Sequence, residues 1–202
     1  MFYKPGEPHG LPHDPFNSCV VPRPIGWVST LAPDGTPNLA PYSFFNGIAY
    51  KPVMVMFSST GKQPHGPKDS IYNAEATGEF VINMVTWNLR EKMNMTSAPV
   101  TPETNEFDIA GIEMEPSELV KPPRVKGSPI HLECEYLQTV ELPCDTEGGR
   151  NAMCVGRVLG VHIKDEYIKD GLIDIERIKP LGRMGYHDYA VVDKIFTMTR
   201  PG

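Results

Sequence analysis

RPIGWVSTLAPDGTPNLAPYSFFNG, residues 23–47, is the most informative part of the sequence about the fold. Two apolar runs, at 25–31 and 37–45, flank the tetrapeptide Ala32-Pro33-Asp34-Gly35. Proline presets the backbone φ angle that such a turn needs, and glycine accepts a positive φ without steric cost. The stretch therefore predicts a β-hairpin.

Further strands are predicted on the C-terminal side of this hairpin. Short apolar runs occupy 52–59 and 79–85, and the run at 130–142 alternates apolar and polar residues as a half-buried antiparallel strand should. The run at 152–163 alternates less cleanly and follows an acidic, glycine-containing loop at 143–151.

Helical patterns are short. Residues 70–77 can form two turns, with Asp69 or Ser70 as the N-cap and Gly78 as the stop, and 87–96 is the best helix candidate. Residues 97–127 are mostly irregular. About six or seven strands with two or three short helices favour a mainly β fold, a closed or nearly closed antiparallel barrel, over a doubly wound sheet. We expect one domain over 1–202, in which 1–18 form an extended N-terminal arm.

Composition supports this class. The 202 residues include 21 Pro and 18 Gly without a period, which disfavours long helices. A net charge of -6 argues against nucleic acid or an acidic membrane as partner. There is no membrane-length apolar run and no signal-peptide pattern, so we expect a cytoplasmic protein. The four cysteines form no CxxC pair, so we expect reduced thiols.

The loop SSTGKQPHGPKDS, residues 58–70, has the spacing of a P-loop opening at Gly61 and Gly66, but Pro67 stands where the lysine should follow. Nucleoside triphosphate binding is therefore not indicated. A single phosphate would suit the Lys68 cation, a helix N-terminus at Asp69 or Ser70, and the hydroxyls of Ser58, Ser59, Thr60 and Ser70. The same residues also fit a capped helix behind a solvated loop.

Two further groups of residues are candidates for ligand contacts. In the hairpin, hydroxyls and an amide (Ser29, Thr30, Ser43, Asn46) lie among aromatic side chains (Trp27, Tyr42, Phe44, Phe45). Such a set could hold a planar ring, or could simply form the barrel wall. Near the C-terminus Arg183, Tyr186 and Tyr189 surround a compact turn that could fold over a ligand or close the barrel.

Other catalytic patterns are missing from the sequence. The six histidines are scattered, and Gly10 and Pro12 argue against a metal pair at His9 and His13, so no metal site is predicted. No GxSxG, HExxH or strand-linked GxGxxG motif occurs. The residues alone identify no catalytic group.

Six segments, in this order, resemble the flavin reductase-like family of FMN-binding split β-barrels, which includes flavoredoxin. They are PRPIGWVST (22–30), DGTPNLAPYSFFNGIAYKP (34–52), VMFSS (55–59), GPKDSIYNAEATGEFVINMV (66–85), VGRVLGVHI (155–163) and PLGRMGYHDYAVV (180–192). The resemblance implies a split antiparallel barrel with a few short peripheral helices. It also implies a homodimer, with FMN in a groove near the subunit interface.

The resemblance further assigns roles to residues of this chain. Ser29 and Thr30 are expected to line the flavin or phosphate side of the site, and Lys68, Asp69 and Ser70 to anchor the phosphate. The ring and ribityl chain would contact Ser43, Phe44, Phe45 and Asn46. Ser58 and Ser59 would be neighbours of the cofactor, and Arg183 and Tyr186 would contribute from the C-terminal segment.

The activity that the resemblance implies is that of an FMN-dependent oxidoreductase, most simply an NAD(P)H:flavin reductase, with hydride or electron transfer through the flavin N5. NADH or NADPH would be the co-substrate. His162 would lie near a nicotinamide, or be a structural histidine. Two alternatives stay open: a flavoredoxin-like FMN electron carrier that serves a redox partner protein without a nicotinamide site, and a non-catalytic flavin-binding module. Residues 97–127 could cover the flavin edge and select the electron acceptor.

Overall fold

The computed structural model describes residues 1–62, 64 and 68–202. Gly66 and Pro67, on which the comparison with a P-loop depends, lie outside the described residues.

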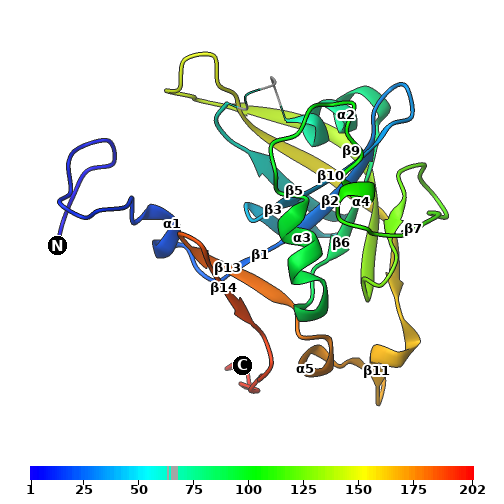
Figure 1. Cartoon of the computed structure of the whole chain (residues 1–202). Helices are drawn as coiled ribbons and strands as arrows, with labels where there is room; N and C mark the ends of the chain where they lie inside the picture. Colours follow the sequence, from blue (N-terminus) through cyan, green and yellow to red (C-terminus); the bar gives the residue numbers. More distant parts are fainter. Residues whose placement is uncertain (63, 65–67) are drawn as a thin grey trace.

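A seven-stranded antiparallel sheet forms the body of the molecule, in the order β3-β2-β6-β9-β10-β5-β4 (Figure 1). Its strands are β2 (Gly26–Leu31), β3 (Pro37–Tyr42), β4 (Phe45–Tyr50), β5 (Val53–Ser59), β6 (Glu79–Met84), β9 (Ile130–Leu142) and β10 (Asn151–Ile163). The hairpin predicted from residues 23–47 is confirmed as β2 and β3, which pair from Gly26 opposite Tyr42 to Leu31 opposite Pro37. The mainly β prediction is confirmed as well.

One strand boundary was predicted wrongly. The run 37–45 is not one strand: β3 ends at Tyr42 and β4 begins at Phe45. The bend at Ser43 and Phe44 carries the chain from one edge of the sheet to the opposite edge, because β3 and β4 are the two terminal strands in the sheet order. Since β3 and β4 do not pair with each other, the sheet is split between them and not closed. Ser43 and Phe44 stand at this split.

The main helix is α2 (Asp69–Thr77), which packs against β2, β3, β6 and β9. Its N-cap is Lys68, one residue before the expected cap. Gly78 ends the helix as predicted, with a φ of +77° that an L side chain rarely adopts. The predicted helix over 87–96 is a 3-10 turn, η1 (Trp87–Leu89), continued by α3 (Arg90–Met95).

The other elements are short. Residues 97–127 hold only α4 (Glu106–Ile109), β7 (Met114–Glu115) and β8 (Arg124–Val125). After β10 come η2 (Asp165–Tyr167), β11 (Ile168–Lys169), β12 (Leu172–Ile173) and α5 (Ile175–Ile178). None of the helices within the described residues is long and apolar enough to cross a membrane.

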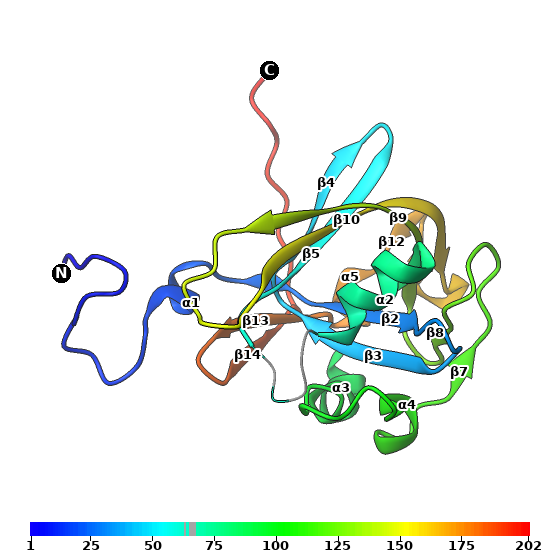
Figure 2. The same cartoon turned by 90° about the horizontal axis from the view of Figure 1, so that it is seen from above.

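A second, three-stranded sheet stands beside the body. It has the order β1-β13-β14, built from β1 (Arg23–Pro24), β13 (Leu181–Gly185) and β14 (Asp188–Val191). The compact turn expected near Tyr186 is therefore a β-hairpin. The N-terminal arm extends away from the body and ends in a short helix, α1 (Phe16–Cys19) (Figures 1 and 2).

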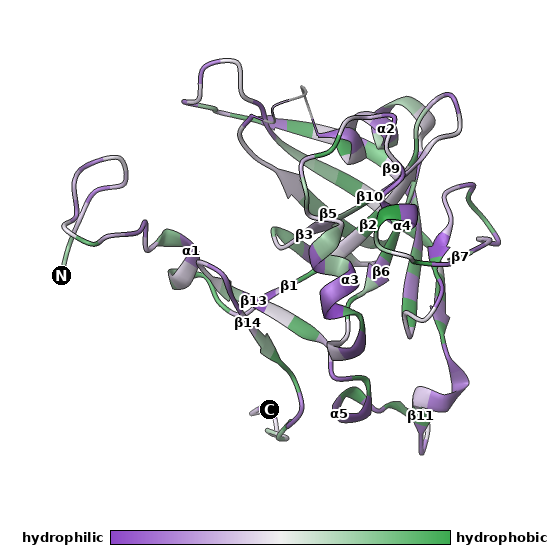
Figure 3. Cartoon of the chain, viewed as in Figure 1, coloured by the Kyte–Doolittle hydropathy of each residue, from purple (hydrophilic) through white to green (hydrophobic). Residues whose placement is uncertain are grey.

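Two apolar clusters fill the body. One, below α2, includes Phe57, Phe80 and Cys154, and the other, behind α3 and α4, includes Trp27 and Phe107. Alternate residues of the strands supply these clusters, so hydrophobic and hydrophilic positions follow one another along the sheet (Figure 3). All four cysteines are free thiols, as expected.

Candidate functional site

A groove of about 420 Å³ lies between the body and the small sheet. Its walls come from β1, β13 and β14, from the bend between β3 and β4, from the end of β5, and from α3. The lining residues are Asn17, Arg23, Ile25, Pro41, Tyr42, Ser43, Phe44, Ser58, Thr60, Lys68, Met93, Asn94, Ser97, Arg183, His187 and Tyr189. We call this space the groove.

Two arginines stand side by side in the lining of the groove. Arg23 on β1 is directly opposite Arg183 on β13, so both side chains leave the same face of the small sheet. Arg23 is only 6% exposed and donates to the Val20 carbonyl at 2.7 Å, to the Asn17 carbonyl and to Ser43 Oγ at 3.3 Å. Burial, and next the neighbouring Arg183, lower the pKa of the Arg23 guanidinium. No carboxylate pairs with either arginine among the described residues.

Lys68 is a third cation in the lining of the groove. Lys68 immediately precedes α2, and its ammonium lies 5.4 Å from the centre of the Tyr42 ring. Burial lowers the pKa of Lys68, and no ion pair of this lysine exists in the described part of the chain. A helix N-terminus beside a half-buried ammonium favours an anion such as phosphate.

The groove combines these cations with aromatic and hydroxyl groups. Tyr42, Phe44 and Tyr189 supply aromatic surface, and Ser43, Ser58 and Thr60 supply hydroxyls. No acidic side chain lines the groove within the described residues. Like charges that face one another without a counter-ion are unfavourable, so the arrangement fits an anionic, partly aromatic ligand.

The groove brings together five of the residues expected at the site: Ser43, Phe44, Ser58, Lys68 and Arg183. Asp69 and Ser70 lie next to it, in a polar pocket of about 90 Å³ that Lys68 and Tyr42 also line. Ser59 faces away from Ser58, because successive residues of a strand point to opposite sides of the sheet, and it lines a smaller recess with Arg150.

The remaining expected residues do not line the groove. Ser29 is buried and donates from Oγ to the Pro123 carbonyl at 2.5 Å, and Thr30 accepts from Asn73 Nδ2 at 3.1 Å beneath α2. Phe45 packs over Gly26, where an added Cβ would meet its Cγ at 2.7 Å. Asn46 is exposed on β4 and accepts a hydrogen bond from the Gly47 amide. Ser29, Thr30 and Phe45 are thus packed within the body, whereas Asn46 is exposed to solvent.

Tyr186 supports the site indirectly. Its side chain is exposed, and its carbonyl accepts a hydrogen bond from Arg183 Nη2. Tyr186 adopts a φ of +45°, which turns the chain from β13 into β14. The Tyr186 carbonyl therefore helps to fix the Arg183 side chain in the lining of the groove.

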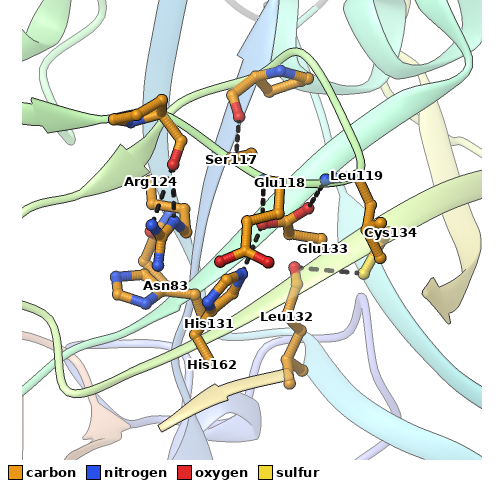
Figure 4. Close-up of polar contacts among 12 residues, drawn as sticks. Asn83, Ser117, Glu118, Leu119, Arg124, His131, Leu132, Glu133, Cys134 and His162 are labelled. Carbon is orange, nitrogen blue, oxygen red and sulfur yellow. Dashed lines mark hydrogen bonds and ion pairs between the residues drawn. The ribbon is translucent and has the colours of Figure 1, made fainter. Parts of the chain in front are cut away.

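His162 lies elsewhere. Its Nε2 is 2.6 Å from Glu133 Oε1, and Glu133 is fully buried (Figure 4). Glu133 also accepts from the Leu119 amide at 2.6 Å and the Glu118 amide at 2.9 Å. His162 is absent from the groove lining, so its contacts match the structural interpretation and not the nicotinamide one.

A buried polar network supports the Lys68 segment. Ser70 Oγ donates to Asn38 Oδ1 at 2.8 Å, and Asn38 Nδ2 donates to Glu106 Oε1 at 2.8 Å. Glu106 also accepts from the Leu39 amide at 3.0 Å. Burial raises the pKa of Glu106 to about 7. The network connects α4, β3 and the first turn of α2, so it positions the segment that carries Lys68.

Sequence reasoning missed several lining residues. Arg23, Asn94, Ser97 and His187 come from β1, α3, the chain after α3, and the turn after β13. Arg23 had one local signal, since it lies inside the stretch 23–47 that predicts the hairpin and just before its first apolar run. No local signal marks the other three, which reach the groove only through the packing of distant segments. Within the described residues no group of His, Cys, Asp and Glu could hold a metal ion.

Comparison with known proteins identifies the family. The model of the flavin reductase like domain matches residues 18–181. The chain belongs to the flavin reductase-like family. A relative from Halalkalibacterium halodurans is 36% identical over 186 residues, which cover 91% of this chain and 88% of that protein. Another from Aquifex aeolicus is 38% identical and covers 82% of each chain.

Solved structures resemble this flavin reductase-like protein over almost its whole length. Nitrilotriacetate monooxygenase component B from Bacillus cereus superposes with a TM-score of 0.88 at 27% identity, covering 98% of both chains. The 2-nitrobenzoate 2-nitroreductase of Pseudomonas fluorescens gives 0.80 at 25% identity, covering 92% and 88%. Flavoredoxin of Desulfovibrio vulgaris gives 0.77 at 18% identity, covering 98% and 97%, and shows the shared split-barrel fold.

Proposed function

We propose that the protein is an FMN-dependent oxidoreductase, most simply an NAD(P)H:flavin reductase, and that the groove holds FMN. The observation that carries this proposal is the lining of the groove: three cations, hydroxyls and aromatic rings, with no acidic side chain among the described residues. Family membership supports a flavin as the ligand. Bound FMN would supply hydride or electron transfer, which the side chains alone do not provide.

The phosphate of FMN is assigned to the Lys68 end of the groove. Lys68 would neutralise the phosphate as a point charge, and the N-terminus of α2 would contribute backbone N–H groups. Ser58 and Thr60 would add hydroxyls, since both line the groove together with Lys68. Tyr42 keeps the Lys68 ammonium in place through its ring face.

Arg23, Arg183 and Ser43 would hold the more distant part of the ligand. Both arginines have fixed positions, because Arg23 is bonded to two carbonyls and Arg183 to Tyr186 and Tyr189. The positive charge of the two arginines would stabilise a negatively charged ring more than a neutral ring. The groove therefore suits a cofactor that gains negative charge on reduction.

The test is the affinity for FMN and for riboflavin, which lacks the phosphate. Lys68→Ala should weaken FMN binding about 10- to 100-fold, the loss of a charge-assisted contact, and leave riboflavin binding unchanged. Lys169→Ala, at an exposed position on β11, is the matched control. Equal loss of both ligands, or of neither, would contradict the phosphate assignment.

Anaerobic mixing of the FMN-loaded protein with NADH or NADPH tests the reaction. Bleaching of the flavin bands by either nucleotide supports the reductase. A flavin that stays oxidised with both nucleotides, but is reduced by dithionite, would replace the reductase with an electron carrier.

We also propose a homodimer. Large apolar side chains are exposed on the β4–β5 hairpin, at Ile48, Tyr50 and Val53, and Tyr50 is 92% exposed. The hairpin and the C-terminal tail both project from the body (Figure 2). Exposed apolar side chains gathered on projecting segments favour burial against a second copy.

A further inference from the structure

A second cavity, of about 460 Å³, adjoins the groove. It lies between η1 and α3 on one side and the β13–β14 hairpin on the other. Met93, Asn94, Arg183, His187 and Tyr189 form the wall that it shares with the groove. Trp87, Arg90 and Glu91 are among the residues that line this cavity and not the groove. We call this cavity the Trp87 cleft.

A guanidinium is stacked on an aromatic ring on each side of the Trp87 cleft. Arg90 lies 3.9 Å from the centre of the Trp87 ring, and Arg183 lies 4.5 Å from the centre of the Tyr189 ring. Trp87 is 46% exposed and Tyr189 39%, so each ring still offers surface to a ligand. Stacking fixes the plane of each guanidinium while leaving its edge accessible.

Both arginines keep hydrogen-bonding capacity. Arg90 uses Nη1 on the Trp87 carbonyl at 2.8 Å and Nε on Glu91 at 3.3 Å, and Arg183 uses Nη1 and Nη2 on Tyr189 and Tyr186. Arg90 Nη2 and Arg183 Nε have no partner in the described part of the chain. Glu91 is the one acid among the described residues of the lining, and its side chain is 78% exposed, so its pairing with Arg90 contributes little.

We propose that the Trp87 cleft binds a second ligand, a planar aromatic carboxylate, with the ring against Trp87 and Tyr189 and the carboxylate on Arg90 and Arg183. A guanidinium edge matches a carboxylate in geometry and charge, and the exposed aromatic faces match a flat ring. A guanidinium edge also binds phosphate, so a dinucleotide is the competing occupant and is one outcome of the test below.

This inference goes beyond the proposed function and needs no bound flavin. The chain has two tryptophans. Trp27 is fully buried and donates to Thr96 Oγ1 at 2.9 Å, whereas Trp87 faces the cleft. Fluorescence of Trp87 therefore reports on the cleft, and Trp27 serves as an internal reference.

The experiment titrates the flavin-free full chain with 2-naphthoate, its neutral counterpart 2-naphthamide, and acetate, following affinity by calorimetry and location by tryptophan fluorescence. We expect 2-naphthoate to bind at least tenfold more tightly than either of the other two and to quench Trp87 saturably. Trp87→Phe should remove the fluorescence change while calorimetric affinity stays within about threefold. Equal affinity for naphthoate and naphthamide would overturn the proposal.

Arg90→Gln is the decisive variant, because Arg90 lines the cleft and not the groove. It should weaken 2-naphthoate about tenfold and leave the FMN affinity unchanged, which also shows that the variant is folded. Arg157→Gln, exposed on β10 outside both cavities, should change neither affinity. Unchanged naphthoate affinity in Arg90→Gln would overturn the proposal. So would tight binding of NADH or NADPH that Arg90→Gln abolishes while naphthoate does not bind.

Discussion

Among single residues of the groove, Arg23 is expected to contribute most to the stability of the protein. Its guanidinium joins the Asn17 carbonyl, the Val20 carbonyl and Ser43 while almost fully buried. Arg23→Lys keeps the charge but cannot satisfy these acceptors together, since a lysine ammonium lacks the planar fork. We expect the free energy of unfolding in urea to fall by about 1–3 kcal/mol. Arg157→Lys is the control, and equal stability of Arg23→Lys and wild type would contradict this reading of the network.

Glu106 makes stability depend on pH. Its pKa is raised from 4.5 to about 7 in the folded protein because the carboxyl is buried. Between these two values the folded state therefore binds the proton more tightly than the unfolded state, and stability falls as pH rises. We expect wild type to lose up to about 3 kcal/mol relative to Glu106→Gln between pH 4.5 and pH 7, measured by urea unfolding. A difference that stays constant with pH would refute the assignment.

His131 makes stability depend on pH in the opposite direction. Burial lowers its pKa from 6.5 to about 4, and its Nδ1 has no hydrogen-bond partner in the described structure. The unfolded state binds the extra proton in this window, so stability rises with pH from 4 to 6.5. His131→Asn should remove up to about 3 kcal/mol of that dependence while leaving the Glu106 slope in place. The same urea series measures both effects, and an unaltered acid limb in His131→Asn would count against the burial argument.

At the scale of elements, the segment 116–125 depends on side chains from the sheet. Glu133 on β9 accepts from the Glu118 and Leu119 amides (Figure 4). Asn83 Oδ1 on β6 accepts from the Val125 amide at 2.8 Å. Glu133→Ala would leave two amides without acceptors, each costing about 1–3 kcal/mol where buried. We expect amide hydrogen exchange in 117–121 to accelerate at least tenfold. Glu135→Ala, exposed on the same strand, should leave exchange unchanged, and protection retained in Glu133→Ala would show that other contacts hold the segment.

Some helices and strands could be predicted from the sequence and others could not. Local signals were sufficient for the first hairpin, the end of α2 at Gly78 and the long strands β9 and β10, because turn chemistry and alternation act between neighbours. They failed at Ser43 and Phe44, where the chain changes sheet edge while keeping a strand-like composition. Ser58 lines the groove and Ser59 does not, although the sequence predicts both at the site. The pairing of β5 with β10 decides which of the two serines faces the groove. Arg23 and Arg183 meet through a pairing that spans most of the chain.

The whole molecule is expected to be a dimer in solution. Tyr50, at the tip of β4, is the most exposed aromatic side chain on the β4–β5 hairpin. Sedimentation equilibrium should give twice the 22.5 kDa chain mass. Tyr50→Asp should shift the population towards monomer because it places a charge in an apolar contact. Tyr72→Asp, on exposed α2 surface, is the control. A wild-type monomer at all concentrations would contradict the dimer.

Flavin binding involves the whole molecule, since the body, the small sheet and α3 all contribute walls to one groove. The most direct measurement is the visible absorption spectrum of the full chain after incubation with FMN and removal of free flavin by gel filtration. We predict that flavin bands near stoichiometric intensity elute with wild type and are much reduced in Lys68→Ala. A wild-type protein that elutes without flavin bands would contradict the account.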